Sequence, residues 1–100
     1  MCTLYHTTTT DRAAAILHDG FRDAKGHYGT DIELCGVWLS DQALDVNEGV
    51  HGDTVLVVTL SVSLSDLADY ELIEEGKPYR EWCIPAELVN RCTRVEQASH

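Results

Sequence analysis

Three residues with side chains suited to chemistry lie in three separate stretches of strand-like sequence: His6, Trp38 and Glu81. Each of them has at least one aliphatic or aromatic residue next to it in the chain, and side chains alternate between two faces along a strand. Alternation predicts a core face formed by Trp82 and Ile84 and places Glu81 on the opposite face, so its carboxylate is held between bulky neighbours on a rigid element. Such a carboxylate is either a solvated strand residue or a placed functional group. A core histidine and a core indole are the corresponding structural interpretations of His6 and Trp38.

Length and charge limit the partners of these residues. One hundred residues form a single domain over residues 1–100, with an adequate but small core. The net charge of −10 disfavours a nucleic-acid backbone as the main partner, because phosphate binding needs a basic surface. A small anionic ligand is compatible with this charge, since one arginine and a few backbone N–H groups can hold it. With no long apolar run and no signal sequence, we expect a cytoplasmic protein without a membrane partner.

The spacing of the cysteines, histidines and carboxylates indicates neither a metal site nor a redox site. The four cysteines form no C-x-x-C pair, which argues against a zinc ribbon or a thioredoxin-like site. We expect reduced thiols, with Cys35 and Cys83 as small core residues of strands. No pair of histidines or carboxylates has convincing ligand spacing, so the sequence indicates no metal.

The elements that must position the three residues follow from periodicity and turn signals. Helical segments are expected at 11–19, ended by Gly20, and as short turns at 65–69 and 85–89. Residues 22–34 are expected to be a polar loop, in which 25–29 could cover a ligand. Strands are expected at 3–7, 35–41, 54–64, 70–73, 79–84 and, as an edge, 91–96. This pattern predicts an α+β domain with a mixed or antiparallel sheet.

The ordered set of histidine, aromatic residue and glutamate resembles the ADP-ribosyltransferase superfamily, in its diphtheria-toxin and poly(ADP-ribose) polymerase branch. LYHTT at 4–8 is similar to the first motif of that branch, and GVWLSD at 36–41 to the second, with Trp38 at the place of the usual tyrosine. REWCIP at 80–85 places Glu81 where the catalytic glutamate of the family stands. The resemblance spans about residues 3–92. It implies two small mixed or antiparallel sheets that form a cleft, with one N-terminal helix.

The resemblance also implies that NAD is the cofactor, used as a substrate. His6 would hydrogen-bond a ribose hydroxyl, the backbone of Thr7 would hold the nicotinamide carboxamide, and Trp38 would stack on the nicotinamide ring. Glu81 would be catalytic. It would accept a hydrogen bond from the ribose and stabilise the oxocarbenium-like cation that forms as nicotinamide leaves.

Further cofactor contacts follow from the same resemblance. Ser40, in the second motif, is counted with the cofactor-binding residues, and Tyr28 would supply the second stacking aromatic that polymerases carry beyond their second motif. The pyrophosphate would need Arg12, Arg22 or backbone donors, and the sequence does not choose among them.

As a member of this family the chain is expected to transfer ADP-ribose from NAD to a protein or nucleic-acid acceptor, or to hydrolyse NAD. One alternative is an inactive domain of the same fold that serves as a ligand-binding or protein-interaction module. Another is an NAD-dependent RNA 2'-phosphotransferase, which shares the fold, NAD use and the first-strand histidine. That enzyme relies on a further basic set for its phosphorylated RNA end, and we find no such set in this acidic chain.

Overall fold

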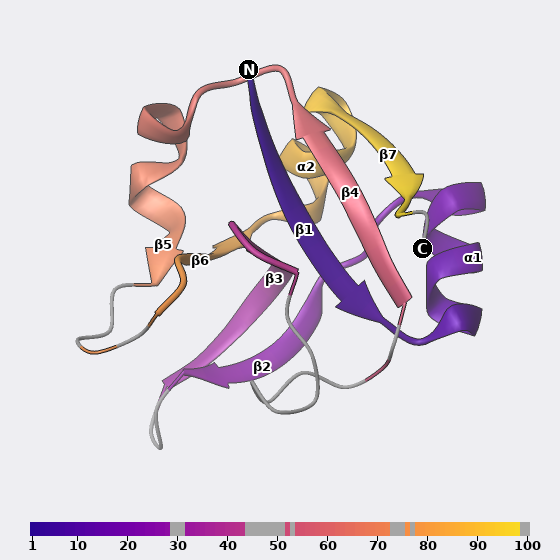
Figure 1. Cartoon of the computed structure of the whole chain (residues 1–100). Coiled ribbons are helices and arrows are strands. Elements are labelled where there is room, and N and C mark those ends of the chain that lie inside the picture. Colours follow the sequence, from indigo (N-terminus) through magenta and orange to yellow (C-terminus); the bar gives the residue numbers. More distant parts are fainter. Residues whose placement is uncertain (29–31, 44–51, 53, 73–75, 77, 99–100) are drawn as a thin grey trace.

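The computed structural model describes residues 1–28, 32–43, 52, 54–72, 76 and 78–98, with the side chains of 27, 28 and 32 outside the described part. Strands and helices alternate irregularly along the chain (Figure 1). In order they are β1 (Cys2–Thr8), α1 (Thr10–Asp19), β2 (Ala24–Tyr28), β3 (Ile32–Ser40), β4 (Thr54–Leu60), the 3-10 helix η2 (Leu64–Tyr70), β5 (Glu71–Leu72), β6 (Glu81–Ile84), α2 (Ala86–Cys92) and β7 (Thr93–Gln97).

The described strands form one antiparallel sheet of seven strands, in the order β5-β6-β3-β1-β4-β7, with β2 paired to β3. The expected α+β class is confirmed, whereas the expected division into two sheets is not found. The length of β3 explains the difference, because residues 32–36 pair with β2 and residues 37–40 continue the same strand against β6. Only one pair of Cα partners, Tyr5 and Ser40, joins β3 to β1. The two halves of the sheet therefore separate beyond this point.

The prediction of a polar loop over 22–34 was wrong, because this segment contains β2 and the first part of β3. Among the described strands β2 pairs with β3 alone, and Ala24 and Lys25 are exposed. An edge strand of this kind needs no apolar periodicity, so the glycines and charges of the sequence resembled a loop.

Helix α1 begins and ends as its sequence predicts. The Thr9 hydroxyl at the N-cap accepts a hydrogen bond from the Arg12 backbone N–H at 3.3 Å, which satisfies one free donor of the first turn. Gly20 ends the helix at a φ of 89°, a conformation that favours glycine, and its N–H donates to the Ile16 carbonyl at 2.8 Å. The helix therefore stops at Gly20, and the next residue, Phe21, is buried in the core.

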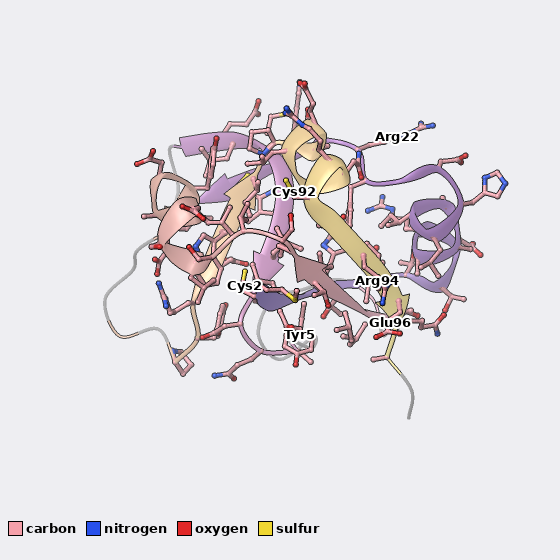
Figure 2. All side chains as sticks on the ribbon, turned by 90° about the horizontal axis from the view of Figure 1, so that it is seen from above. Cys2, Tyr5, Arg22, Cys92, Arg94 and Glu96 are labelled. Carbon is pink, nitrogen blue, oxygen red and sulfur yellow. The ribbon has the colours of Figure 1, made fainter. Side chains whose placement is uncertain are left out.

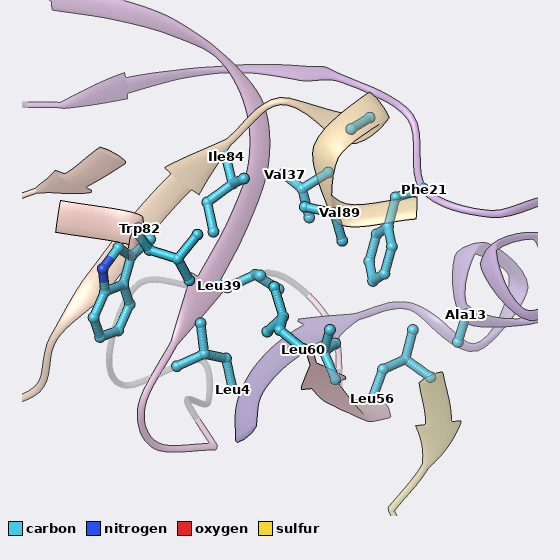
Figure 3. Close-up of a cluster of buried hydrophobic side chains, with 13 residues drawn as sticks. Leu4, Ala13, Phe21, Val37, Leu39, Leu56, Leu60, Trp82, Ile84 and Val89 are labelled. Atoms are coloured by element: carbon cyan, nitrogen blue, oxygen red, sulfur yellow. The ribbon is translucent and has the colours of Figure 1, made fainter. Parts of the chain in front are cut away.

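The hydrophobic core lies against one face of the sheet (Figure 3). β4 alternates buried and half-buried residues along its length, as a strand with one core face should. Trp82 and Ile84 are fully buried, which confirms the predicted core face of β6. Cys35 is exposed, so its predicted place in the core was wrong, and Cys83 is half-buried. No helix in the described part of the chain combines the length and the apolar character needed to cross a membrane.

Candidate functional site

A cleft of about 790 Å³ opens between α1 and the strands β2 and β3. It lies where β3 separates from β1, so both strands contribute side chains to it. His6 and Thr7 of β1, Trp38 of β3 and Glu81 of β6 all line this cleft. Residues far apart in the sequence, each expected to act on the same ligand, are thus brought to one place.

His6 is held by a hydrogen bond across the gap between β1 and β3. Its Nδ1 lies 2.8 Å from the carbonyl oxygen of Trp38. A carbonyl oxygen can only accept, so Nδ1 carries the proton and, in the neutral ring, Nε2 is an acceptor. Burial lowers the pKa of His6 below its ordinary value; the hydrogen bond to Trp38 opposes this shift, and the charge of Arg12 adds to it. The ring is therefore neutral at pH 7.

A second contact fixes the orientation of the His6 ring. Phe21 meets it edge to face, with ring centroids 5.3 Å apart and an interplanar angle of 88°. Phe21 is itself held at both backbone groups by the Asn90 amide, which accepts from the Phe21 N–H at 2.8 Å and donates to the Phe21 carbonyl at 2.8 Å. α2 thus supports the position of a histidine on β1.

The position of His6 gives a pH-dependent stability that can be measured. The pKa of His6 is lower in the folded chain than in the unfolded chain, where it has the ordinary value of 6.5. As the pH falls below that value, the unfolded chain therefore binds a proton at His6 before the folded chain does. The contribution of His6 to the free energy of unfolding should therefore be complete above pH 6.5 and should be lost as the pH falls toward the lowered pKa of the folded state. Urea denaturation across this window should show a weaker pH dependence for His6→Gln than for the wild type. Equal dependence in the two proteins would contradict the buried neutral ring.

Trp38 lies against the backbone of β2. A Cβ built on Gly26 would come within 2.8 Å of the indole Cζ2, so only glycine allows the strand to approach the ring this closely. Trp38 remains half-buried and lines the cleft. An indole in this position has an extended π surface beside an open volume, which suits the stacking of a planar ligand.

Glu81 begins β6, where its neighbours fix the main chain. The Asp41 N–H donates to the Arg80 carbonyl at 3.0 Å, and the Arg80 N–H donates to the Asp41 carboxylate at 2.9 Å. The Arg80 guanidinium in turn donates twice to the Glu71 carboxylate, at 2.9 and 2.7 Å. These contacts fix both the backbone and the side chain of Arg80, which immediately precedes Glu81 and the start of β6. Glu81 itself is half-buried and lines the cleft.

The cleft concentrates basic residues in an acidic chain. Of the seven lysines and arginines in the sequence, Arg12, Arg22 and Lys25 line it, against the carboxylates of Asp19 and Glu81. Figure 2 shows the Arg22 side chain extending from the ribbon. Guanidinium groups are suited to bind phosphates through paired hydrogen bonds. The local charge therefore favours an anionic ligand although the whole chain carries −10.

One residue expected to bind the cofactor, Ser40, is placed differently, and another, Tyr28, is described by its backbone alone. Ser40 is buried and does not line the cleft; its hydroxyl lies 2.6 Å from the carbonyl oxygen of Gln42 and 3.4 Å from that of Tyr5, as a donor. Its role in the structure is to join β3 to β1 and to the following turn. The backbone of Tyr28 ends β2, but its side chain is outside the described part, so its stacking role stays a prediction.

Sequence reasoning gave Phe21 and Tyr79 no role at the site, and it included Gly26 only in a segment, 25–29, that could cover a ligand. Tyr79 lines the cleft and is two residues from Glu81, so alternation along the strand was a usable signal. The contact of Phe21 with His6 and the approach of Gly26 to Trp38 join segments distant in sequence, and no local pattern reports them.

No family model matches this chain, and no curated protein and no solved structure matches it significantly. The chemistry of the cleft has to be judged from its own residues.

Proposed function

We propose that this chain is an NAD-binding protein of the ADP-ribosyltransferase type, which breaks the bond between nicotinamide and ribose. The observation that carries the proposal is the single cleft lined by His6, Thr7, Trp38 and Glu81. These are residues that the motif resemblance assigns to NAD, and they come from three strands. The cleft volume of about 790 Å³ is in the usual range of small-molecule and cofactor sites, roughly 300–1,000 Å³.

The proposed binding mode uses each group for a part of NAD that suits it. The nicotinamide ring of NAD is cationic and planar, so the Trp38 indole is a favourable surface for it. Neutral His6 accepts a hydrogen bond from a ribose hydroxyl through Nε2, since Nδ1 is already bound to the Trp38 carbonyl. Arg12 and Arg22 are near enough to the same volume to hold the pyrophosphate.

The proposed reaction places Glu81 beside the charge that develops. The bond between ribose C1' and the nicotinamide nitrogen breaks, and its electron pair leaves with nicotinamide, which becomes neutral. The ribose becomes cationic, so a carboxylate fixed in advance stabilises the transition state more than the ground state. A nucleophilic atom of the acceptor, or water, then bonds to C1' and releases its proton to Glu81 or to solvent.

The assignment to an ADP-ribosyltransferase-like fold belongs to the same proposal. The α+β class and the antiparallel sheet are compatible with it. Further support comes from β3, which separates from β1 after one residue pair and leaves the cleft between them. A cofactor that enters there would contact both halves of the sheet.

Chromatography of a reaction with NAD tests the proposal. Purified protein, with and without a cell lysate as a source of acceptors, should release one nicotinamide for each NAD consumed. The ADP-ribose should appear free in solution if water is the acceptor and bound to macromolecules otherwise. Arg91→Ala, on the exposed side of α2 and outside the cleft lining, should retain the activity. No nicotinamide under either condition would contradict the proposed bond cleavage.

A further inference from the structure

We infer that two copies of this chain associate through β7 (Thr93–Gln97), whose outer edges pair antiparallel and join two sheets into one. β7 is the last strand in the sheet order, and among the described strands it pairs with β4 alone. An uncovered edge strand presents unpaired N–H and C=O groups that can bind another strand. This inference concerns assembly and is independent of the proposed reaction.

Hydrogen bonds at the two ends of β7 define which backbone groups face inward. The Ala98 N–H donates to the Val55 carbonyl at 2.9 Å, and the Ser61 N–H donates to the Cys92 carbonyl at 2.9 Å. In an antiparallel ladder, hydrogen-bonded and non-hydrogen-bonded pairs alternate. The even-numbered residues of this strand therefore direct their backbone groups toward β4.

The odd-numbered residues Thr93, Val95 and Gln97 consequently direct their N–H and C=O groups outward. A two-fold axis at Val95 would place this residue opposite its own copy and Thr93 opposite Gln97 of the partner subunit. Every outward-facing residue of β7 would then take part in a hydrogen-bonded pair. The register between the two copies therefore follows from the outward backbone groups of β7, and the pairing needs no insertion or bulge.

The side chains between these pairs are electrostatically self-complementary. In the same register, Arg94 is opposite the partner's Glu96, and the two-fold axis repeats this contact. Both residues, labelled in Figure 2, are exposed, and neither belongs to an ion pair within the part of the chain that the structure describes. They would occupy a non-hydrogen-bonded pair, in which side chains are closest, and opposite charges there are stabilising. This complementarity favours a second copy as the partner of the edge.

A hollow of about 400 Å³ lies beside the same edge, lined partly by Ile16, Leu17, Thr93 and Val95. Leu17 is 45% exposed and, apart from Met1, is the exposed large hydrophobic residue of the described chain. A two-fold axis perpendicular to the sheet keeps the α1 helices of both copies on the same face. Leu17 would thus lie beside the junction, where association can cover it and add apolar burial.

Sedimentation equilibrium from micromolar to millimolar concentration tests the inference. The wild type should reach twice the 11.1 kDa mass of one chain. Arg94→Glu and Glu96→Arg each turn both attractive pairs into repulsive ones, so each should raise the dimer dissociation constant by at least about tenfold. The double variant Arg94→Glu/Glu96→Arg restores opposite charges and should recover wild-type association. Arg91→Glu, exposed on α2, is the charge-matched control and should leave association unchanged.

Amide hydrogen exchange of the wild type provides a measurement without any substitution. The outward N–H of Val95 should exchange more slowly as the protein concentration rises, whereas the N–H of Arg94, which faces β4, should change little. A wild type that stays monomeric, a double variant that fails to recover, or a Val95 exchange rate independent of concentration would each overturn the inference.

Discussion

Glu81→Gln is expected to slow NAD cleavage by about a hundred- to a thousandfold. Glutamine keeps the shape of the side chain but removes the negative charge that would face the ribose cation. Because that cation exists only as the bond breaks, the loss should appear in kcat, whereas the dissociation constant for NAD should change only a few-fold. The measurement is single-turnover release of nicotinamide at saturating NAD.

A matched control separates the effect of charge at the cleft from general effects of charge. Glu87 is exposed on α2 and forms a long contact of 3.6 Å with Arg91, outside the cleft lining. Glu87→Gln removes the same charge from the chain and should leave kcat unchanged. Equal rates for Glu81→Gln and the wild type would mean that Glu81 has no role in the transition state.

Trp82→Ala should lower the free energy of unfolding by about 3–5 kcal/mol, a large part of the stability of a small domain. The indole is fully buried in the core, and the Arg80 guanidinium carbon lies 4.9 Å from its ring centroid. Truncation would leave a cavity beside the strand that carries Glu81. Urea denaturation followed by circular dichroism measures the change without relying on tryptophan fluorescence.

Trp82→Phe is the informative companion variant. The indole Nε1 is buried without a hydrogen-bond partner among the described residues, and an unsatisfied donor costs about 1–3 kcal/mol. Phenylalanine removes that donor and retains most of the apolar volume, so its cost should be far smaller than that of alanine. If alanine cost no more than phenylalanine, the core packing of Trp82 described above would be wrong.

The sequence predicted well those elements whose pattern is local. β1, β4 and β6 lie in runs rich in aliphatic, aromatic and β-branched residues, and α1 has both a threonine N-cap and a terminal glycine. The buried face of Trp82 and Ile84 followed from alternation alone. β7 was correctly expected at an edge. In each case neighbouring residues determine the structure, so a single sequence contains the required information.

The errors concern structure determined by distant contacts. β2 is stabilised by pairing with β3 and by the approach of Gly26 to Trp38, so its own residues did not reveal a strand. Ser40 was grouped with the cofactor ligands because of its motif, but its hydroxyl is directed toward backbone carbonyls. The support of Phe21 by Asn90 joins segments at opposite ends of the chain. Sequence reasoning selected His6, Thr7, Trp38 and Glu81, which line one cleft, but it could not determine the contacts that hold them there.

Nuclear magnetic resonance of the wild type during titration with NAD tests the central claim most directly. The chain has two tryptophans, and their indole N–H signals report on two environments: Trp38 lines the cleft and Trp82 is fully buried outside its lining. Our account predicts a saturable shift of the Trp38 signal, together with the imidazole signals of His6, while the Trp82 signal changes little. The absence of any shift at millimolar NAD, or a shift confined to Trp82, would contradict binding of NAD in this cleft.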